Sequence, residues 1–177
     1  DAAALVDAAP HLTSRAARHI ARGVLDRMIR DAARVSLPHL RAALDDVGLD
    51  PLALAALFDV PVPCILRRLA AVPELGLGLV VADRAGSLLF RKGAVGFTIP
   101  RYGSACPLWP LFQALGLPGQ VLYQRLRMMG RSDAVFDCYA AAETMGPLSL
   151  NAPPLVQASM IVIPVPGAEP LTGPDPF

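Results

Sequence analysis

The sequence predicts an α+β chain: a small helical bundle, then an antiparallel sheet domain of about five strands with one helix. Two observations support this prediction. Before Pro73, apolar residues recur at helical spacing between capping residues, whereas after Glu74 they alternate along short runs separated by turns. We therefore expect a helical domain over residues 1–73, a sheet domain over 74–166 and an extended, proline-rich tail over 167–177.

The composition is that of a folded chain. Hydrophobic residues make up 54% of the 177 residues and charged residues 18%, which excludes disorder as the default state. No apolar run approaches the length of a membrane span, and the first residues lack the basic leader of a signal peptide, so we expect a cytoplasmic protein without a membrane partner. The net charge of +1 gives no electrostatic reason to expect nucleic-acid binding by this chain.

Capping residues divide the helical half. Residues 13–14 cap a helix that runs to about Ala33, Ser36 caps a second helix that ends near Gly48, and Asp50 caps a third. The first of these helices is amphipathic, with arginines on its solvated side. Its apolar face consists of Ala17, Ile20, Val24, Met28 and Ala32.

Residues 52–60 and 64–69 are expected to form two helices joined by a tight turn. The second helix opens on residues 61–64, Pro-Val-Pro-Cys, which offer almost nothing to read base edges with, so we do not expect DNA recognition by this pair. The histidines lack the i,i+4 spacing with which a helix binds zinc, and no His-Glu-x-x-His motif occurs. They are His11, His19 and His39.

Alternating apolar runs predict two hairpins and a fifth strand. The runs cover residues 76–82, 87–91, 120–127, 134–141 and 155–163. A short helix is expected near Cys106, between the two hairpins. The resulting order, β-β-α-β-β-β, suits a single antiparallel sheet with helices on one side, as in small-molecule sensors of the PAS and GAF kind.

The loop over residues 100–112 gathers the only tryptophan, a cysteine and three prolines. The prolines fix three φ angles and remove three donors, which holds the loop in shape. Trp109 and Phe112 fall at i,i+3 on the expected helix and point the same way, with Arg101 and Tyr102 just upstream. This combination suits a pocket wall, and a packing role for Trp109 is the alternative.

The run Arg101-Tyr102-Gly103-Ser104-Ala105-Cys106-Pro107-Leu108-Trp109 resembles the Arg-(Phe/Tyr)-Gly-Gly-(Thr/Ser)-Cys-Pro-Leu-Trp signature of the sensor domain in bacterial short-chain fatty-acid transcriptional regulators. Residues 119–122, Gly-Gln-Val-Leu, are similar to that family's Pro-Gly-(Arg/Lys)-Ile strand start, and Gln124 to a polar residue in the strand. Two departures are Ser104-Ala105, where the family has a second Gly and usually Thr, and Pro110, where Asn is common. The resemblance covers residues 52–166.

In that family, which includes the propionate regulators, a helix-turn-helix of the phage-repressor (XRE) type precedes a metallopeptidase-like region and the sensor. The resemblance implies that this chain is the end of the metallopeptidase-like region plus the effector-sensing domain. It further implies a short-chain acyl coenzyme A or fatty acid as ligand, a homodimer, and DNA binding only through a helix-turn-helix outside this sequence. A dimerisation module without a ligand is the alternative.

Such a ligand needs an apolar slot and cationic or amide donors. The residues expected to supply them are Arg101, Tyr102, Cys106, Trp109, Phe112, Gln124 and Tyr139.

The three cysteines are Cys64, Cys106 and Cys138, an odd number at wide spacing. We expect reduced thiols rather than disulfides or a self-contained metal site. The resembling regulators run on into a cysteine-rich tail that holds an iron-sulfur cluster, and this sequence reaches Phe177 without one. Cys106 is therefore expected to bind metal only where that tail is present, and no cofactor is expected in this chain. No histidine follows His39 to activate Cys106, so we expect no enzymatic activity.

Overall fold

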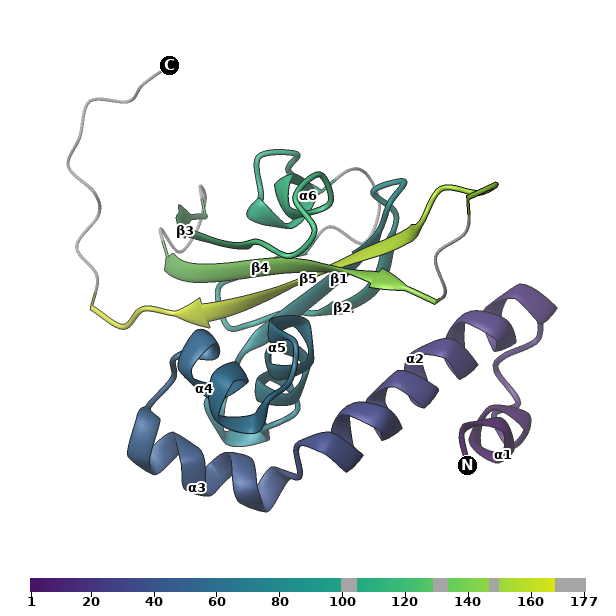
Figure 1. The fold of residues 1–177 in the computed structure, drawn as a ribbon, viewed down its shortest axis with the longest axis horizontal. Helices are drawn as coiled ribbons and strands as arrows, with labels where there is room; N and C mark the ends of the chain where they lie inside the picture. The colour runs from purple at the N-terminus through teal and green to yellow at the C-terminus, as the bar shows by residue number, and fades with distance from the viewer. Residues whose placement is uncertain (100–104, 129–133, 147–149, 168–177) are drawn as a thin grey trace. The chain divides into compact units, whose positions relative to one another are not determined.

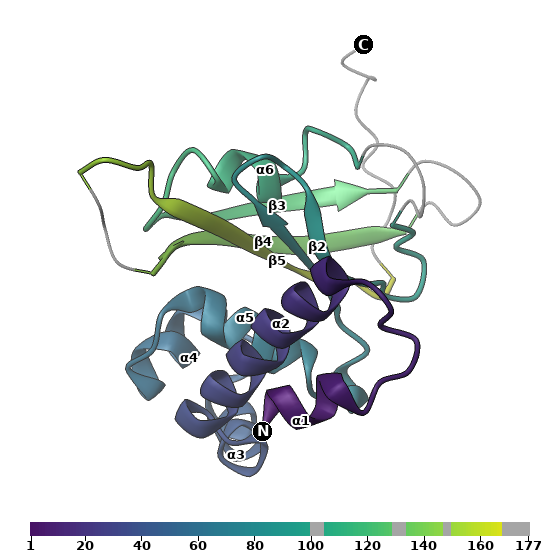
Figure 2. The ribbon, with the colours of Figure 1, turned by 90° about the vertical axis from the view of Figure 1, so that its right-hand side faces the viewer.

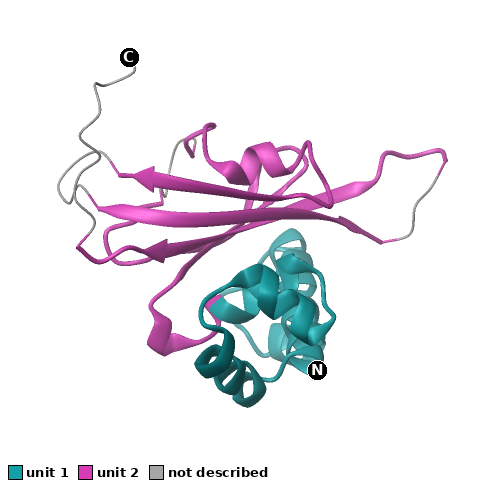
Figure 3. Ribbon diagram, turned by 60° about the vertical axis from the view of Figure 1, so that its left-hand side comes forward, with its two compact units in different colours: residues 1–69 teal, residues 70–177 magenta. Residues whose placement is uncertain are grey.

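The computed structural model describes residues 1–99, 105–128, 134–146 and 150–167. Figure 3 shows the two compact units into which the chain divides, residues 1–69 and residues 70–177. The first unit is helical, and the second contains a five-stranded antiparallel sheet with a short helix. The predicted α+β class is confirmed.

Five helices follow one another from the N-terminus (Figure 1). They are α1 (Ala2–Asp7), α2 (Arg15–Arg34), α3 (Leu37–Val47), α4 (Pro51–Phe58) and α5 (Val62–Ala70). Three begin where the sequence predicts, because a side chain accepts from the first turn of each. Ser14 caps α2, Ser36 caps α3 and Asp50 caps α4. Helix α1 was not predicted from the sequence.

The long helix α2 does not bury the apolar face expected of it. Ile20 and Met28 are 49% and 46% exposed, and the buried residue of this helix is Asp31. Asp31 is buried because it forms an ion pair with α5. Arg67 Nε donates to Asp31 Oδ2 over 2.6 Å and Arg67 Nη2 to Asp31 Oδ1 over 3.1 Å. Arg68 Nε also donates to the carbonyl of Val35, over 2.8 Å, so the C-terminal turn of α2 makes these contacts.

The sheet has the order β2-β1-β5-β4-β3, and all its neighbours are antiparallel. Its strands are β1 (Gly78–Asp83), β2 (Leu88–Lys92), β3 (Val121–Arg127), β4 (Val135–Met145) and β5 (Leu155–Pro164). A 3₁₀ turn, Pro73–Leu75, precedes it, and α6 (Pro110–Ala114) lies between the hairpins. The two hairpins and the fifth strand match the prediction, with β4 running four residues further than expected, from Ala141 to Met145.

The two faces of the sheet differ in character. Figure 2 shows α6 against one of them, here called the α6 face. Its buried residues form the main core of the second unit and come from β1, β4, β5 and the loop around α6. They are Val80, Ala82, Phe97, Trp109, Leu111, Ala114, Phe136, Cys138, Ala140, Ala142, Val156, Ala158, Met160 and Val162. The opposite side, here called the far face, carries Leu79, Val81 and Phe90 on one edge and polar residues on the other.

Among the described residues, no helix has the length and apolarity that crossing a bilayer requires.

Candidate functional site

The helix of the predicted site begins later than the sequence suggests. The backbone N–H of Trp109 donates to the carbonyl of Cys106, which closes a turn before the helix. Trp109 then has an extended ψ of 141° and serves as the N-terminal cap residue, and Pro110 occupies the first helical position. This is the position where proline costs no hydrogen bond. The expected helix start near Cys106 is therefore wrong by about one turn.

Trp109 is part of an aromatic cluster on the α6 face. Its ring centroid lies 5.1 Å from that of Phe97, which lies 5.2 Å from that of Phe136 in an edge-to-face arrangement. All three side chains are buried, and Trp109 is 5% exposed. Phe97 was not predicted from the sequence as a site residue. The sequence contains one signal for it, because Phe97 is an aromatic residue shortly before the proline-rich loop over residues 100–112.

Two further predicted residues lie on the same face. Phe112 is half-buried and packs against the α6-face core. Its ring also faces the turn of the first hairpin, because a Cβ added at Gly86 would lie 3.7 Å from Phe112 Cε1. Gln124 is half-buried and lies opposite Cys138 on β4, whose side chain belongs to that core. The structure therefore places Trp109, Phe112 and Gln124 on one face.

Tyr139 is not on this face. It lies next to Cys138 along β4, and successive side chains of a strand point to opposite faces. Its ring stacks against Tyr123, with centroids 5.1 Å apart. The structure thus does not bring Tyr139 together with Trp109 and Gln124.

The far face carries a polar cluster that the sequence analysis missed. Arg125 forms a two-pronged ion pair with Asp137, with Nε to Oδ1 over 2.7 Å and Nη2 to Oδ2 over 2.9 Å. Tyr123 donates its hydroxyl proton to the same Oδ1 over 2.7 Å. The hydrogen bonds from Arg125 lower the pKa of Asp137, and the bond to Asp137 raises the pKa of Tyr123. The signal was present in the alternation of tyrosine and arginine along β3, opposite an aspartate.

The remaining predicted residues are accounted for as follows. Arg101 and Tyr102 lie outside the described residues. Cys106 is an exposed free thiol, whereas Cys64 and Cys138 are buried. Burial raises the pKa of Cys138 to about 12, and burial together with the nearby Asp31 carboxylate raises that of Cys64 to about 12.

These thiols do not fit an iron-sulfur cluster. Cluster ligands are thiolates, and burial raises the pKa of Cys64 and Cys138 and so disfavours their thiolate form. In the part of the chain that the structure describes, no three side chains among histidine, cysteine, aspartate and glutamate gather to hold a metal. No chemistry of a bound cluster is therefore assigned to these residues.

Comparison with known proteins finds similarity to one family of regulators. A family model described as "Short-chain fatty acyl coenzyme A regulator, C-terminal" matches residues 68–152. The HTH-type transcriptional regulator RamB of Mycobacterium tuberculosis is 27% identical over 121 residues, which cover 66% of this chain and 26% of RamB. The propionyl-CoA carboxylase regulator of Cereibacter sphaeroides is 33% identical over 114 residues, which cover 61% of this chain and 24% of that protein. The chain thus spans about a quarter of the length of these relatives.

A solved structure named as a Mycobacterium tuberculosis transcriptional regulator is similar in fold. Its TM-score is 0.65 at 21% sequence identity, and the match covers 92% of this chain and 51% of that one. The matching family model and both relatives are regulators by their descriptions, which agrees with the predicted regulator domain.

Proposed function

We propose that this chain senses the effector of a bacterial transcriptional regulator, because residues 68–152 match the model of the C-terminal domain of short-chain fatty acyl coenzyme A regulators. The proposed ligand is a short-chain acyl coenzyme A or the free acid. The observation that carries the proposal is this family match, which runs from β1 through α6 to β4. The propionyl-CoA carboxylase regulator among the relatives supports a ligand of that class.

The α6 face supplies the chemistry that such a ligand needs. Phe112 offers a half-buried ring for the acyl chain, and Trp109 backs it from within the core. Gln124 offers an amide on the same side of the sheet. Arg101 and Tyr102 remain predicted donors to the ligand, and Cys106 remains a predicted contact next to the acyl pocket. Tyr139 would have to act from the far face.

The mechanism that fits this role is a shift in population. A ligand that binds one arrangement of the sensor domain better than another favours that arrangement in proportion to the difference in affinity. In the full-length protein, a homodimer would pass this change to a helix-turn-helix that binds DNA. The five-stranded antiparallel sheet with a helix on one face supports the comparison with PAS and GAF sensors.

The test is isothermal titration of the folded chain with acetyl-, propionyl- and butyryl-coenzyme A and with the free acids. We expect saturable binding that changes with chain length, since each buried methylene is worth about 0.8 kcal/mol, or about fourfold in Kd. Phe112→Ala should weaken binding, and Leu108→Ala, whose side chain is 63% exposed in the same segment, should not. A well-folded chain that binds none of these compounds would contradict the proposal.

A structural dimerisation module without a ligand is the second candidate. The packing of Trp109 against Phe97 in the core favours a role without a ligand, because this side chain already has a structural function. Arg101→Ala separates the two functions. It should weaken a phosphate contact by about 1.5–3 kcal/mol if a ligand binds, while the oligomeric state stays the same.

A further inference from the structure

The strand β3 lies at one end of the sheet, with β4 as its neighbour. Along an edge strand, half of the backbone N–H and C=O groups point away from the sheet and are free to pair with another strand. β3 has seven residues in unbroken register with β4, from the pair of Val121 with Ala141 to that of Arg127 with Val135. It contains no proline, glycine or lysine. It is therefore a long, regular edge.

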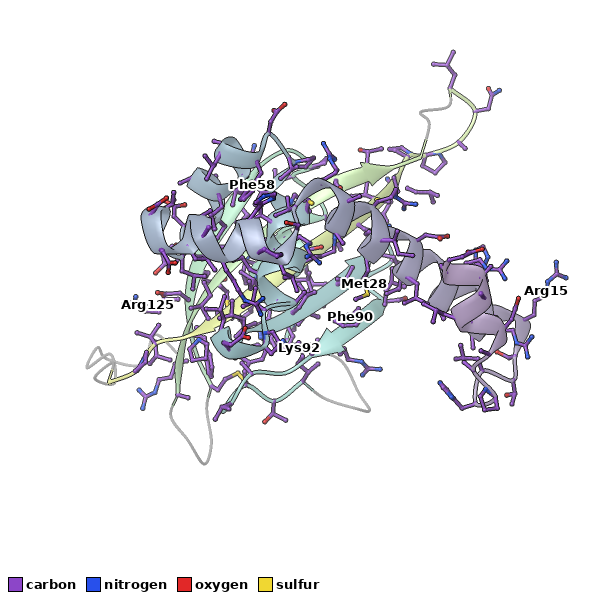
Figure 4. All side chains as sticks on the ribbon, turned by 90° about the horizontal axis from the view of Figure 1, so that it is seen from below. Arg15, Met28, Phe58, Phe90, Lys92 and Arg125 are labelled. Carbon is purple, nitrogen blue, oxygen red and sulfur yellow. The ribbon has the colours of Figure 1, made fainter. Side chains whose placement is uncertain are left out.

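The other edge of the same sheet is built differently. β2 has only five residues and ends at Lys92, and the register of its pairing shifts between Val81 and Ala82 of β1. Lys92 also donates to the carbonyl of Ala70 over 2.5 Å. Short length and an irregular register are features that keep edge strands from pairing with other chains, whereas a terminal cation is common to both edges, Lys92 on β2 and Arg127 on β3. Figure 4 labels Lys92 on β2 and Arg125 on β3, one on each edge strand. The contrast singles out β3 as the edge suited to a partner.

The sequence of β3 is complementary to itself. We propose that β3 pairs antiparallel with β3 of a second copy of this chain, around a two-fold axis at Gln124, so that the two sheets join into one. In this register Leu122 faces Leu126 of the copy on the α6 face, and Tyr123 faces Arg125 of the copy on the far face. Both are favourable cross-strand pairs, an apolar one and an aromatic–cation one.

Charge disfavours the registers in which the two-fold axis lies nearer the C-terminal end of β3. An axis at Arg125 would place that arginine opposite itself, and an axis at Leu126 would place Arg125 opposite Arg127, which like charges disfavour. With the axis at Gln124, Arg127 faces Val121, and the charge of Arg125 is balanced by Asp137 of its own chain. Tyr123 is 53% exposed, and tyrosine and arginine are the residue types enriched at protein interfaces.

This inference rests on the proposed homodimer and is independent of the proposed ligand.

A residue on the two-fold axis is the one that lies directly opposite itself, at a Cβ separation that a disulfide can bridge with slight adjustment. We therefore expect Gln124→Cys to cross-link two copies under mild oxidation. The background carries Cys106→Ser, to remove the exposed thiol, and Cys138→Ala, because Cys138 faces Gln124 within the chain.

The matched control is Tyr123→Cys in a background that carries the same two changes. The two copies of residue 123 would lie diagonally, about 7–8 Å apart, which is too far for a disulfide. Covalent dimer in non-reducing gels for Gln124→Cys, and little for Tyr123→Cys, is the expected result. A dimer that cross-links at neither position would overturn the β3 interface and leave the proposed homodimer standing.

A second arm measures the association itself by sedimentation of the native chain. Tyr123→Arg brings a cation opposite Arg125 of the copy and should raise the dimer dissociation constant by about tenfold or more. Val95→Arg adds the same charge at a loop residue that is 89% exposed and should leave it unchanged. A chain that stays monomeric at every concentration would overturn both this interface and the homodimer, whatever its affinity for acyl ligands. Equal effects of the two substitutions would also overturn the interface.

Discussion

Asp31 and Arg67 form an ion pair that is buried in the first unit. The Asp31 and Arg67 side chains are 8% and 10% exposed. Removing one partner of a buried ion pair leaves the other charge uncompensated. We expect Asp31→Ala to lower the free energy of unfolding by about 3–5 kcal/mol in urea denaturation. Asp46→Ala, at an exposed position of α3, should change it little, and an equal loss in both variants would contradict the assignment.

The three thiols should differ in reactivity. Thiolate is the reactive form, and Cys64 and Cys138 are buried with pKa values of about 12. At pH 8 the native chain should therefore react with a thiol reagent only at the exposed Cys106, and the unfolded chain at all three. Counting released chromophore with and without denaturant checks this. Rapid modification of Cys138 in the native chain would contradict its place in the core.

The same pKa values predict how stability depends on alkaline pH. Folding raises the pKa of both buried thiols from their ordinary value of 9.0 to about 12. The unfolded chain therefore loses these protons first, so the stabilising contribution is complete below about pH 9 and is lost as the pH rises towards 12. Denaturation at several pH values from 8 upward should show the loss, and Cys138→Ala should reduce it.

At the residue scale, the sequence predicted two aromatic residues of the α6 face but not all the residues that lie there. Trp109 and Phe112 stood out because rare residue types gather near them. Gln124 and Tyr139 could be assigned to strands but not to faces, since the face of a residue follows from register, and register depends on the partner strand. The Tyr123–Asp137 contact was missed for the same reason.

Two glycines at the scale of elements should respond in opposite ways to alanine. Gly23 lies inside α2 with no atom within 4 Å of an added Cβ, so Gly23→Ala should raise the free energy of unfolding by about 0.5–1 kcal/mol. Gly78 opens β1 where an added Cβ would meet the Lys92 carbonyl at 3.1 Å and Val162 Cβ at 3.2 Å. Gly78→Ala should lower stability, and thermal melting of the two variants in parallel compares them.

Elements with a capping residue were the ones that the sequence predicted well. Ser14, Ser36 and Asp50 fixed three helix starts because each signal is local. The helix α1 is only six residues long and rich in alanine, so it offers too few positions to show a period. The start of α6 was missed because proline suits both a turn and a first helical position.

At the scale of the whole molecule, the net charge of +1 makes the chain a poor ligand for nucleic acid. We expect no salt-dependent binding to duplex DNA in fluorescence anisotropy at low salt. A full-length transcriptional regulator titrated into the duplex that it binds serves as the positive control. Binding that weakens steeply with added salt would show that this part of the protein contacts phosphates itself.

The sheet order is the feature of the whole molecule that the sequence could least reveal. The hairpins are local, since each turn lies between its two strands, and both were predicted. The pairing of β1 with β5 joins segments from opposite ends of the second unit, and no local signal specifies it. The order suited to a single sheet was predicted, but the position of each strand within it required the structure.

That pairing also has a consequence for how the protein is made. Gly78 pairs with Val162, so β1 leaves the ribosome long before its central neighbour has been synthesised. Closing so long a loop slows folding, because chain entropy must be lost before the contacts that compensate for it form. During translation, the inner edge of the first hairpin stays exposed until nearly all of the second unit has emerged. The centre of the sheet is thus completed last, and this interval is when the nascent chain has most need of a chaperone.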